Sequence, residues 1–234
     1  DPLCRLPGQI AALATASKSA INGVGNEGRA DSFLRADSHA VIAIDGAISF
    51  GDTPWWCCGI SNQSIVRALG EAAADETIDD IVLDIHCPGG DVHGMSDLVD
   101  AVTRAVAAKP VHVLVHDQMA SAALWLAAGA TSITGTPTRE SGSIGVIAMI
   151  EDTTEMASKM GINVHVITSA SLKAAGRFGV EVDESMLSAE QSMVEQMAMP
   201  ATLSPFIAEI RTMMPIVPMD KPPRRPPIQT WNIL

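Results

Sequence analysis

The sequence predicts an α/β fold built around a largely parallel sheet. Short apolar runs rich in β-branched residues alternate along the chain with longer segments whose apolar residues recur at helical spacing. Strands are expected at 40–48, 80–85, 111–115, 144–150 and 163–168, and helices at 7–21, 61–74, 92–107, 120–128 and 153–160. Because such alternation requires crossover connections, the repeated βαβ units place most strands parallel to one another.

The elements follow in order from their residue patterns. In the first helix, apolar residues recur at Ile10, Leu13, Ala14 and Ile21, and the Gly- and Asn-rich stretch 22–28 then acts as a linker. The runs 40–48, 80–85 and 111–115 are short and β-branched, and each is followed by an amphipathic segment. The last two strands flank the helix at 153–160. The expected organisation is an N-terminal helix and linker at 1–38, a core at 39–199 and a tail at 200–234.

The tail is rich in proline, with the run Lys221-Pro-Pro-Arg-Arg-Pro-Pro227 near its end. Proline lacks an amide donor and fixes φ, so this stretch favours extended polyproline structure over helix. We expect the tail to be poorly ordered and to lie outside the fold. Both a docking arm and a truncated or frame-shifted end remain open as explanations.

Composition excludes several classes of partner and site. The 234 residues are 47% hydrophobic and 18% charged, which is typical of one globular core. The net charge of −12 argues against nucleic acid or an anionic membrane as the main partner. The longest apolar stretch, 122–130, is far shorter than the ~20 residues that cross a bilayer. A leader or anchor before Asp1 stays open, and a cytoplasmic location is the expectation.

The four cysteines give no sign of a metal site or a disulfide framework. They have no repeated Cys-x-x-Cys spacing, and Cys57 and Cys58 are adjacent, which would make a strained bridge. We expect reduced thiols, no metal and no cofactor.

Ser121 and Lys173 are the candidate reactive pair. Ser121 follows the run 111–115 and begins an alanine-rich helical stretch, so it lies in a strand-turn-helix setting. A serine hydroxyl needs a neighbouring base, and a lysine acts as one only if burial lowers its pKa from about 10.4 toward roughly 7–8. Gly89 and Gly90 end a turn where backbone N–H groups can approach a developing oxyanion. None of the six histidines lies in a recognisable triad setting.

Four motifs in this order resemble the S49 serine peptidases: Pro88-Gly89-Gly90, Ala120-Ser121-Ala122-Ala123, Gly142-Ser143-Ile144-Gly145-Val146 and Lys173. The resemblance implies the fold of the Clp protease and crotonase superfamily. It also implies Ser121 as nucleophile, Lys173 as general base and Ser143 as a helper, although Ser143 could also serve only a tight strand entry. The implied oxyanion hole consists of the Gly90 and Ala122 amides. The implied substrate-binding residues are Gly89, Gly142, Ile144 and Gly145.

Two features depart from the family pattern. The family usually has serine before Pro-Gly-Gly, where this chain has Cys87. Because the backbone amides that follow are the groups expected to bind the oxyanion, this change need not abolish the function. After Met197 the family normally returns to close the core, whereas this chain runs into the proline-rich tail. The Trp55-Trp56 loop either contacts substrate or packs against the core or another subunit.

The resemblance implies a serine endopeptidase acting on extended polypeptide in a ring-like homo-oligomer. A phage or prophage capsid assembly (prohead) protease that cleaves scaffold or capsid precursors is the expected branch, in the cytoplasm of the host. The alternatives are a signal peptide peptidase without its membrane anchor, a crotonase-like acyl-CoA enzyme and an inactive homologue.

Overall fold

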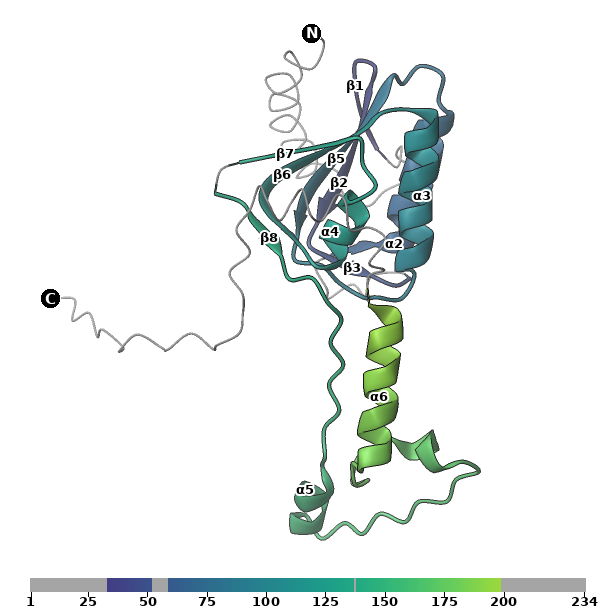
Figure 1. Ribbon diagram of the computed structural model, residues 1–234, viewed down its shortest axis with the longest axis vertical. Helices are drawn as coiled ribbons and strands as arrows, with labels where there is room; N and C mark the ends of the chain where they lie inside the picture. The colour runs from purple at the N-terminus through teal and green to yellow at the C-terminus, as the bar shows by residue number, and fades with distance from the viewer. Residues whose placement is uncertain (1–32, 52–58, 137, 199–234) are drawn as a thin grey trace, which may run out of the picture. The chain divides into compact units, whose positions relative to one another are not determined.

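The described part of the computed structural model covers residues 33–51, 59–136 and 138–198, and its centre is a 6-stranded sheet (Figure 1). The strand order is β1-β2-β5-β6-β7, and β8 pairs with the far end of β6. The strands are β1 (Leu34–Ala36), β2 (His39–Asp45), β5 (Asp80–Cys87), β6 (Val111–Ala120), β7 (Ser132–Gly135) and β8 (Glu140–Gly142). All pairings are parallel except β1 with β2. The α/β class and the largely parallel sheet are confirmed.

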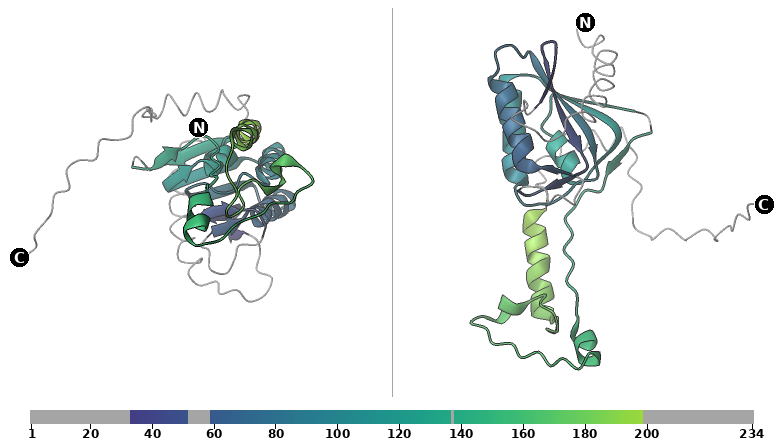
Figure 2. Two further views of the ribbon diagram at one scale, coloured as in Figure 1. Left: turned by 90° about the horizontal axis from the view of Figure 1, so that it is seen from below. Right: turned by 180° about the vertical axis from the view of Figure 1, so that it is seen from behind.

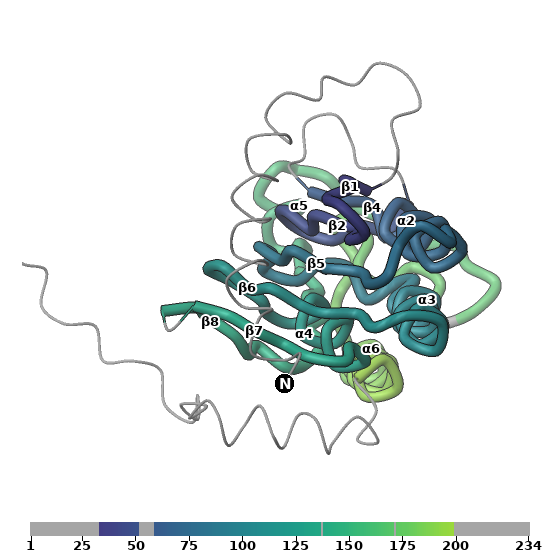
Figure 3. The backbone as a smooth tube through the Cα atoms, turned by 90° about the horizontal axis from the view of Figure 1, so that it is seen from above, coloured from purple at the N-terminus to yellow at the C-terminus, as the bar shows by residue number. Residues whose placement is uncertain are grey.

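Two helices cover one face of this sheet. They are α2 (Asn62–Ala74) and α3 (Met95–Ala108), which lie side by side (Figures 1 and 3) and remain on one side of the sheet when it is seen from behind (Figure 2). Alternate residues of β5, including Leu83 and Ile85, are fully buried. The residues between them belong to the opposite face, where Val41, Val82 and Leu114 form a second buried cluster.

A small two-stranded sheet, β3 (Ala47–Ser49) with β4 (Gly59–Ser61), lies next to the end of β5. The expected strand 40–48 is therefore divided between β2 and β3. The break falls at Gly46, whose φ of +83° favours glycine and whose N–H donates to the His86 carbonyl oxygen at 3.0 Å.

Several boundaries differ from the sequence prediction. β6 continues through 116–120, which we expected to be a turn, because its second half pairs with β8. The helix expected from residue 92 begins at Met95, after Gly94 with φ +74°. The helix expected at 120–128 is α4 (Ala122–Ala127).

The expected strands 144–150 and 163–168 were wrong. From Ser143 to Asp183 the chain forms only α5 (Thr154–Lys159) and the short 3-10 turn η2 (Ser171–Ala174), and then α6 (Glu184–Met197). Both runs are rich in β-branched residues, but a strand also needs a neighbouring edge to pair with, and neither run pairs with any of the described residues. The expectations for 7–21, for Trp55-Trp56 and for the tail from residue 200 lie outside the described residues.

The segment 143–198 buries little of its apolar surface. Within it, only Ala157 and Met186 are buried hydrophobic residues. All but one of the exposed large hydrophobic side chains in the described part of the chain belong to this segment; they are Ile144, Ile147, Met149, Met156, Met160, Ile162, Val164, Val166, Ile167, Leu172, Phe178, Leu187 and Met193. None of the helices within the described ranges is long and apolar enough to cross a bilayer.

Candidate active site

Ser121 lies between the end of β6 and the start of α4, in an unusual backbone conformation. Its φ of +51° and ψ of −120° lie outside the regions that residues with a side chain normally adopt. Its N–H donates to the Gly142 carbonyl oxygen at 2.8 Å, so β8 holds the turn. Strain of this kind persists where the surrounding structure enforces it and often marks a reactive residue. The strand-turn-helix expected from the sequence is present.

The turn after β5 comes close to Ser121. Gly89 has φ +114°, and a Cβ placed on it would lie 2.7 Å from the Ser121 Cβ. A Cβ on Gly90 would lie 1.9 Å from the Ile48 carbonyl oxygen. Ile48 binds this turn through two hydrogen bonds, from its N–H to the Gly89 oxygen and from the Asp91 N–H to its own oxygen, each 2.8 Å. Only glycine fits at positions 89 and 90.

The backbone N–H groups of Gly90 and Ala122 are the available donors beside Ser121. Neither donates in a hydrogen bond recorded within the described ranges. Ala122 is the first residue of α4, and such an amide has no acceptor inside its own helix. Both residues line the same cavity as Ser121. The two amides are thus free to donate hydrogen bonds to the oxyanion of a tetrahedral intermediate.

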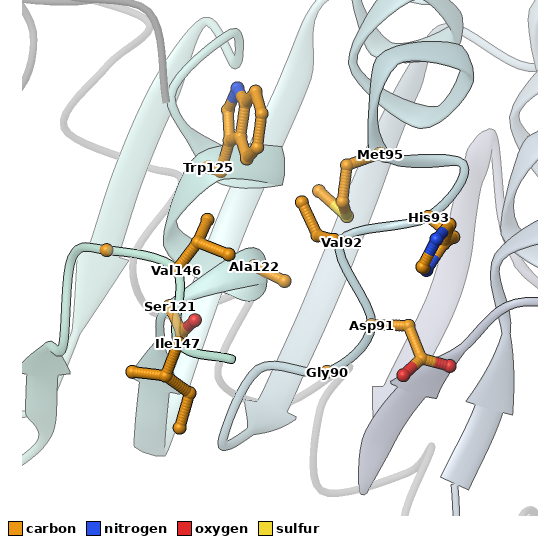
Figure 4. Close-up of a pocket in the computed structure, with 11 residues that line it drawn as sticks. Gly90, Asp91, Val92, His93, Met95, Ser121, Ala122, Trp125, Val146 and Ile147 are labelled. Atoms are coloured by element: carbon orange, nitrogen blue, oxygen red, sulfur yellow. The ribbon is translucent and has the colours of Figure 1, made fainter. Parts of the chain in front are cut away.

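The cavity has a volume of about 290 Å³ and lies between β6, α4 and the start of α3 (Figure 4). Its lining residues are Gly90, Asp91, Val92, His93, Met95, Ser121, Ala122, Trp125, Gly145, Val146 and Ile147. In Figure 4, Val92, Met95, Trp125 and Val146 enclose an apolar space above the Ser121 side chain. An apolar side chain of a bound polypeptide fits such a space.

Sequence reasoning missed most of this apolar wall. Trp125 follows Ser121 by four residues, and residues at this spacing share a helix face, so this one could have been found from the sequence. Val92 and Met95 reach the cavity only because the Gly89-Gly90 turn leads into α3 beside Ser121. Their positions depend on the tertiary fold and have no sequence signal.

The expected substrate-binding residues divide into two groups. Gly145 lines the cavity, and Gly89 and Gly142 contact the Ser121 turn as described above. Ile144 is exposed, and so is the residue before it, the expected helper Ser143, whose φ is +53°. Neither of these two lines the cavity.

Lys173 is not among the residues that line the Ser121 cavity. It lies in η2, is exposed, and its N–H donates to the Ala170 carbonyl oxygen at 3.2 Å. No hydrogen bond or ion pair of its side chain is recorded within the described ranges. The Gly90, Ser121 and Ala122 part of the expected site is assembled in one copy of the chain, and the lysine part is not.

The histidines do not replace Lys173 in the described part of the chain. His93 lines the cavity, but its ring packs against Phe50 with ring centroids 6.2 Å apart. His116 lies in a different cavity with its Nε2 3.0 Å from Asp84 Oδ1. No hydrogen bond joins a histidine to Ser121 among the described residues, and no group of three or more acidic, histidine or cysteine side chains there is arranged to hold a metal ion.

The chain matches the model of peptidase family S49 over residues 104–213, a range that contains Ser121, Ser143 and Lys173. It is 37% identical over 114 residues to capsid assembly protease C of Escherichia phage lambda, covering 49% of this chain and 26% of that protein. It is 31% identical over 161 residues to Protease 4 of Salmonella typhi, covering 68% of this chain and 24% of that protein. The chain belongs to peptidase family S49.

The S49 chain spans about a quarter of the length of these curated relatives. Among solved structures it is similar to an enoyl-CoA hydratase from Mycobacterium smegmatis, with a TM-score of 0.39, 16% sequence identity, and 77% of each chain covered.

Proposed function

We propose that the chain is a serine endopeptidase in which Ser121 is the nucleophile, Lys173 the general base and Ser143 a helper that orients the lysine. The observation that carries the proposal is the strained Ser121 beside two unpaired amides, those of Gly90 and Ala122, in one apolar cavity. S49 membership supports the same assignment.

The reaction proposed for this site has two steps. The Ser121 Oγ attacks the scissile carbonyl carbon while Lys173 takes the hydroxyl proton, and the carbonyl oxygen becomes an oxyanion that the Gly90 and Ala122 N–H groups bind. The C–N bond then breaks, the amine leaves with the proton from Lys173, and an acyl-enzyme remains. Water then attacks this ester while Lys173 takes one of its protons, the bond from the acyl carbon to the Ser121 Oγ breaks, and Lys173 returns the proton to Oγ as the acid product leaves. No metal or cofactor takes part in this scheme.

We propose that a second copy of the chain supplies Lys173. The segment that carries it, 143–198, exposes most of its large apolar side chains. Exposed apolar patches of this extent mark surfaces that contact another chain. A homo-oligomer in which this segment packs against a neighbour would cover these side chains and place the lysine in the dry environment that a neutral amine needs.

The proposed substrate is extended polypeptide, and the proposed process is capsid assembly in a phage-infected cell. The similarity to capsid assembly protease C supports this branch. The apolar wall of Val92, Met95, Trp125 and Val146 suits an apolar side chain of the substrate next to the scissile bond.

The decisive experiment is covalent labelling with a fluorophosphonate probe. We expect the purified chain to carry one adduct on Ser121 by peptide mass spectrometry and the Ser121→Ala variant to carry none, with an unchanged circular dichroism spectrum. Peptide cleavage should fall by about 10³–10⁶ in the same variant. An adduct that persists in Ser121→Ala would overturn the assignment.

Proteolysis outside capsid assembly is the second candidate, and the match to Protease 4 over a larger share of this chain favours it. Signal peptides are the substrate of that alternative. Incubation of the chain with scaffold precursors and with a signal peptide separates the two candidates. A capsid assembly protease should cleave the scaffold precursors, whereas a signal peptide peptidase should cleave the signal peptide.

A further inference from the structure

The Gly89–Gly90 peptide is held through its carbonyl oxygen. No peptide bond is cis, and in a planar trans peptide the C=O and N–H groups point in opposite directions. The Gly89 carbonyl oxygen accepts a hydrogen bond from the Ile48 N–H at 2.8 Å. Any group that holds this oxygen therefore also aims the Gly90 N–H in the opposite direction.

A second group holds the same oxygen. Cys87 is the last residue of β5, and its side chain is fully buried. Its Sγ lies 3.3 Å from the Gly89 carbonyl oxygen, to which the S–H donates, and 3.4 Å from the Gly89 N, which donates to the sulfur. One thiol thus contacts both peptide planes that meet at Gly89.

We propose that Cys87 is a positioning residue for the oxyanion hole, acting through the Gly89–Gly90 peptide plane. The inference rests on the proposed serine peptidase activity, because it assigns the Gly90 N–H to the oxyanion. The Gly89 oxygen accepts hydrogen bonds from two donors, the Ile48 N–H at 2.8 Å and the Cys87 S–H at 3.3 Å. A rotation of the plane that turned the Gly90 amide away from Ser121 would break both hydrogen bonds.

The chemistry of the thiol suits this role. Burial raises the pKa of Cys87 above its ordinary value, which keeps the proton on sulfur at neutral pH, so the S–H remains a donor. A serine hydroxyl at this position can make the same pair of contacts, whereas an alanine methyl can make neither. The effect of a substitution should therefore follow hydrogen bonding rather than volume.

The test measures the reaction of the full-length chain with a fluorophosphonate, separating the maximal rate (kinact) from the half-saturating concentration (KI). Phosphonylation of Ser121 builds negative charge where the Gly90 amide points. Loss of one oxyanion donor costs about 10²–10³ in rate, so a donor that is only misdirected should cost about tenfold. We expect Cys87→Ala to lower kinact about tenfold with KI nearly unchanged, and Cys87→Ser to keep kinact close to wild type.

Ile85→Val is the matched control, because Ile85 is fully buried on the same face of β5 and the change also removes a small apolar volume. It should leave kinact unchanged. The inference is overturned if Cys87→Ala reacts at the wild-type rate, if Cys87→Ser is as slow as Cys87→Ala, or if Ile85→Val is equally slow.

A second readout does not depend on activity. Loss of the sulfur contact should speed hydrogen exchange of the Ile48 amide, which shares the Gly89 oxygen with Cys87, in Cys87→Ala but not in Cys87→Ser. An absence of wild-type labelling at Ser121 would refute the proposed function, and unchanged exchange at Ile48 would refute the positioning role of Cys87.

Discussion

Two regions of the described chain differ in how far their apolar side chains are buried. In the sheet region, residues 33–142, the β-branched and leucine side chains of β2, β5 and β6 are buried, and among the described residues of this region Phe50 is the exposed large hydrophobic one. In the segment 143–198 the large apolar side chains are mostly exposed. Full burial of each such side chain contributes roughly 1.5–3 kcal/mol to stability. In a single copy of the chain, the exposed side chains of the second region do not make this contribution.

This contrast shows how the candidate site is divided. The Gly89-Gly90 turn and Ser121 come from the self-sufficient region, where the sheet and the Ile48 contacts fix their geometry. Lys173 comes from the region that lacks partners. The proposed site needs both regions, and we propose that it is complete only when a second copy of the chain packs against residues 143–198. Self-association is therefore part of the proposed mechanism.

The largest expected effect comes from mixing two inactive variants. Ser121→Ala and Lys173→Ala should each lose about 10³ or more of the peptide cleavage rate, because each removes one member of the proposed pair. When the two are mixed and allowed to exchange copies, activity should return, since one variant offers Ser121 and the other Lys173. Cleavage of a fluorogenic peptide reports the outcome. If the mixture stays inactive while Lys173→Ala is itself inactive, the lysine acts within its own chain.

The next effect concerns the sheet region alone. Gly90→Ala should lower the cleavage rate by about 10²–10³, because a Cβ only 1.9 Å from the Ile48 oxygen must displace the amide that binds the oxyanion. Gly70→Ala on α2 is the control, since a Cβ there meets no atom within 4 Å. Steady-state kinetics on both variants measures the difference, and an equal loss in the control would remove the steric explanation.

A pair of substitutions measures the contrast in stability directly. Leu83→Ala, in the buried sheet, should lower the free energy of unfolding by about 2–5 kcal/mol. Ile167→Ala, where the side chain is 97% exposed, should change it by no more than about 0.5 kcal/mol in a dilute sample. The same Ile167 variant should weaken self-association in sedimentation experiments. A stable wild-type monomer that cleaves peptide at high dilution would contradict the association model.

The smallest expected effect is a local response to acid in the second region. Hydrogen bonds from the Thr154 hydroxyl, the Thr154 N–H and the Val182 N–H hold the pKa of Asp152 below its usual range. A carboxyl group with a lowered folded-state pKa stabilises the fold above pH 4 and loses this contribution as the pH falls further. The protection of the Val182 amide against exchange, measured relative to an unstructured peptide at the same pH, should therefore fall below about pH 4. Asp152→Asn should show this lower protection already at pH 7. An Asn variant with wild-type exchange at both pH values would show that the carboxylate does not hold this loop.

The sequence was sufficient for the elements that depend on local pattern. The parallel sheet follows from alternating strands and helices, and the resemblance to S49 peptidases implied one site that contains Gly90, Ser121 and Ala122. The runs 144–150 and 163–168 failed as strands because hydrophobicity and β-branching describe a side chain, whereas a strand also needs a partner for its backbone. The place of Lys173 in the site stays a prediction.

The backbone pieces of the candidate site are also far apart along the chain. Ile48, the Gly89-Gly90 turn and Ser121 come from β3, the end of β5 and the end of β6, and they meet only when strands from distant parts of the sequence have paired. Parallel pairing between distant segments has a high loop-closure entropy and forms late in folding. The backbone geometry around Ser121 therefore exists only once the sheet is complete, so any activity that depends on this geometry is confined to the folded chain.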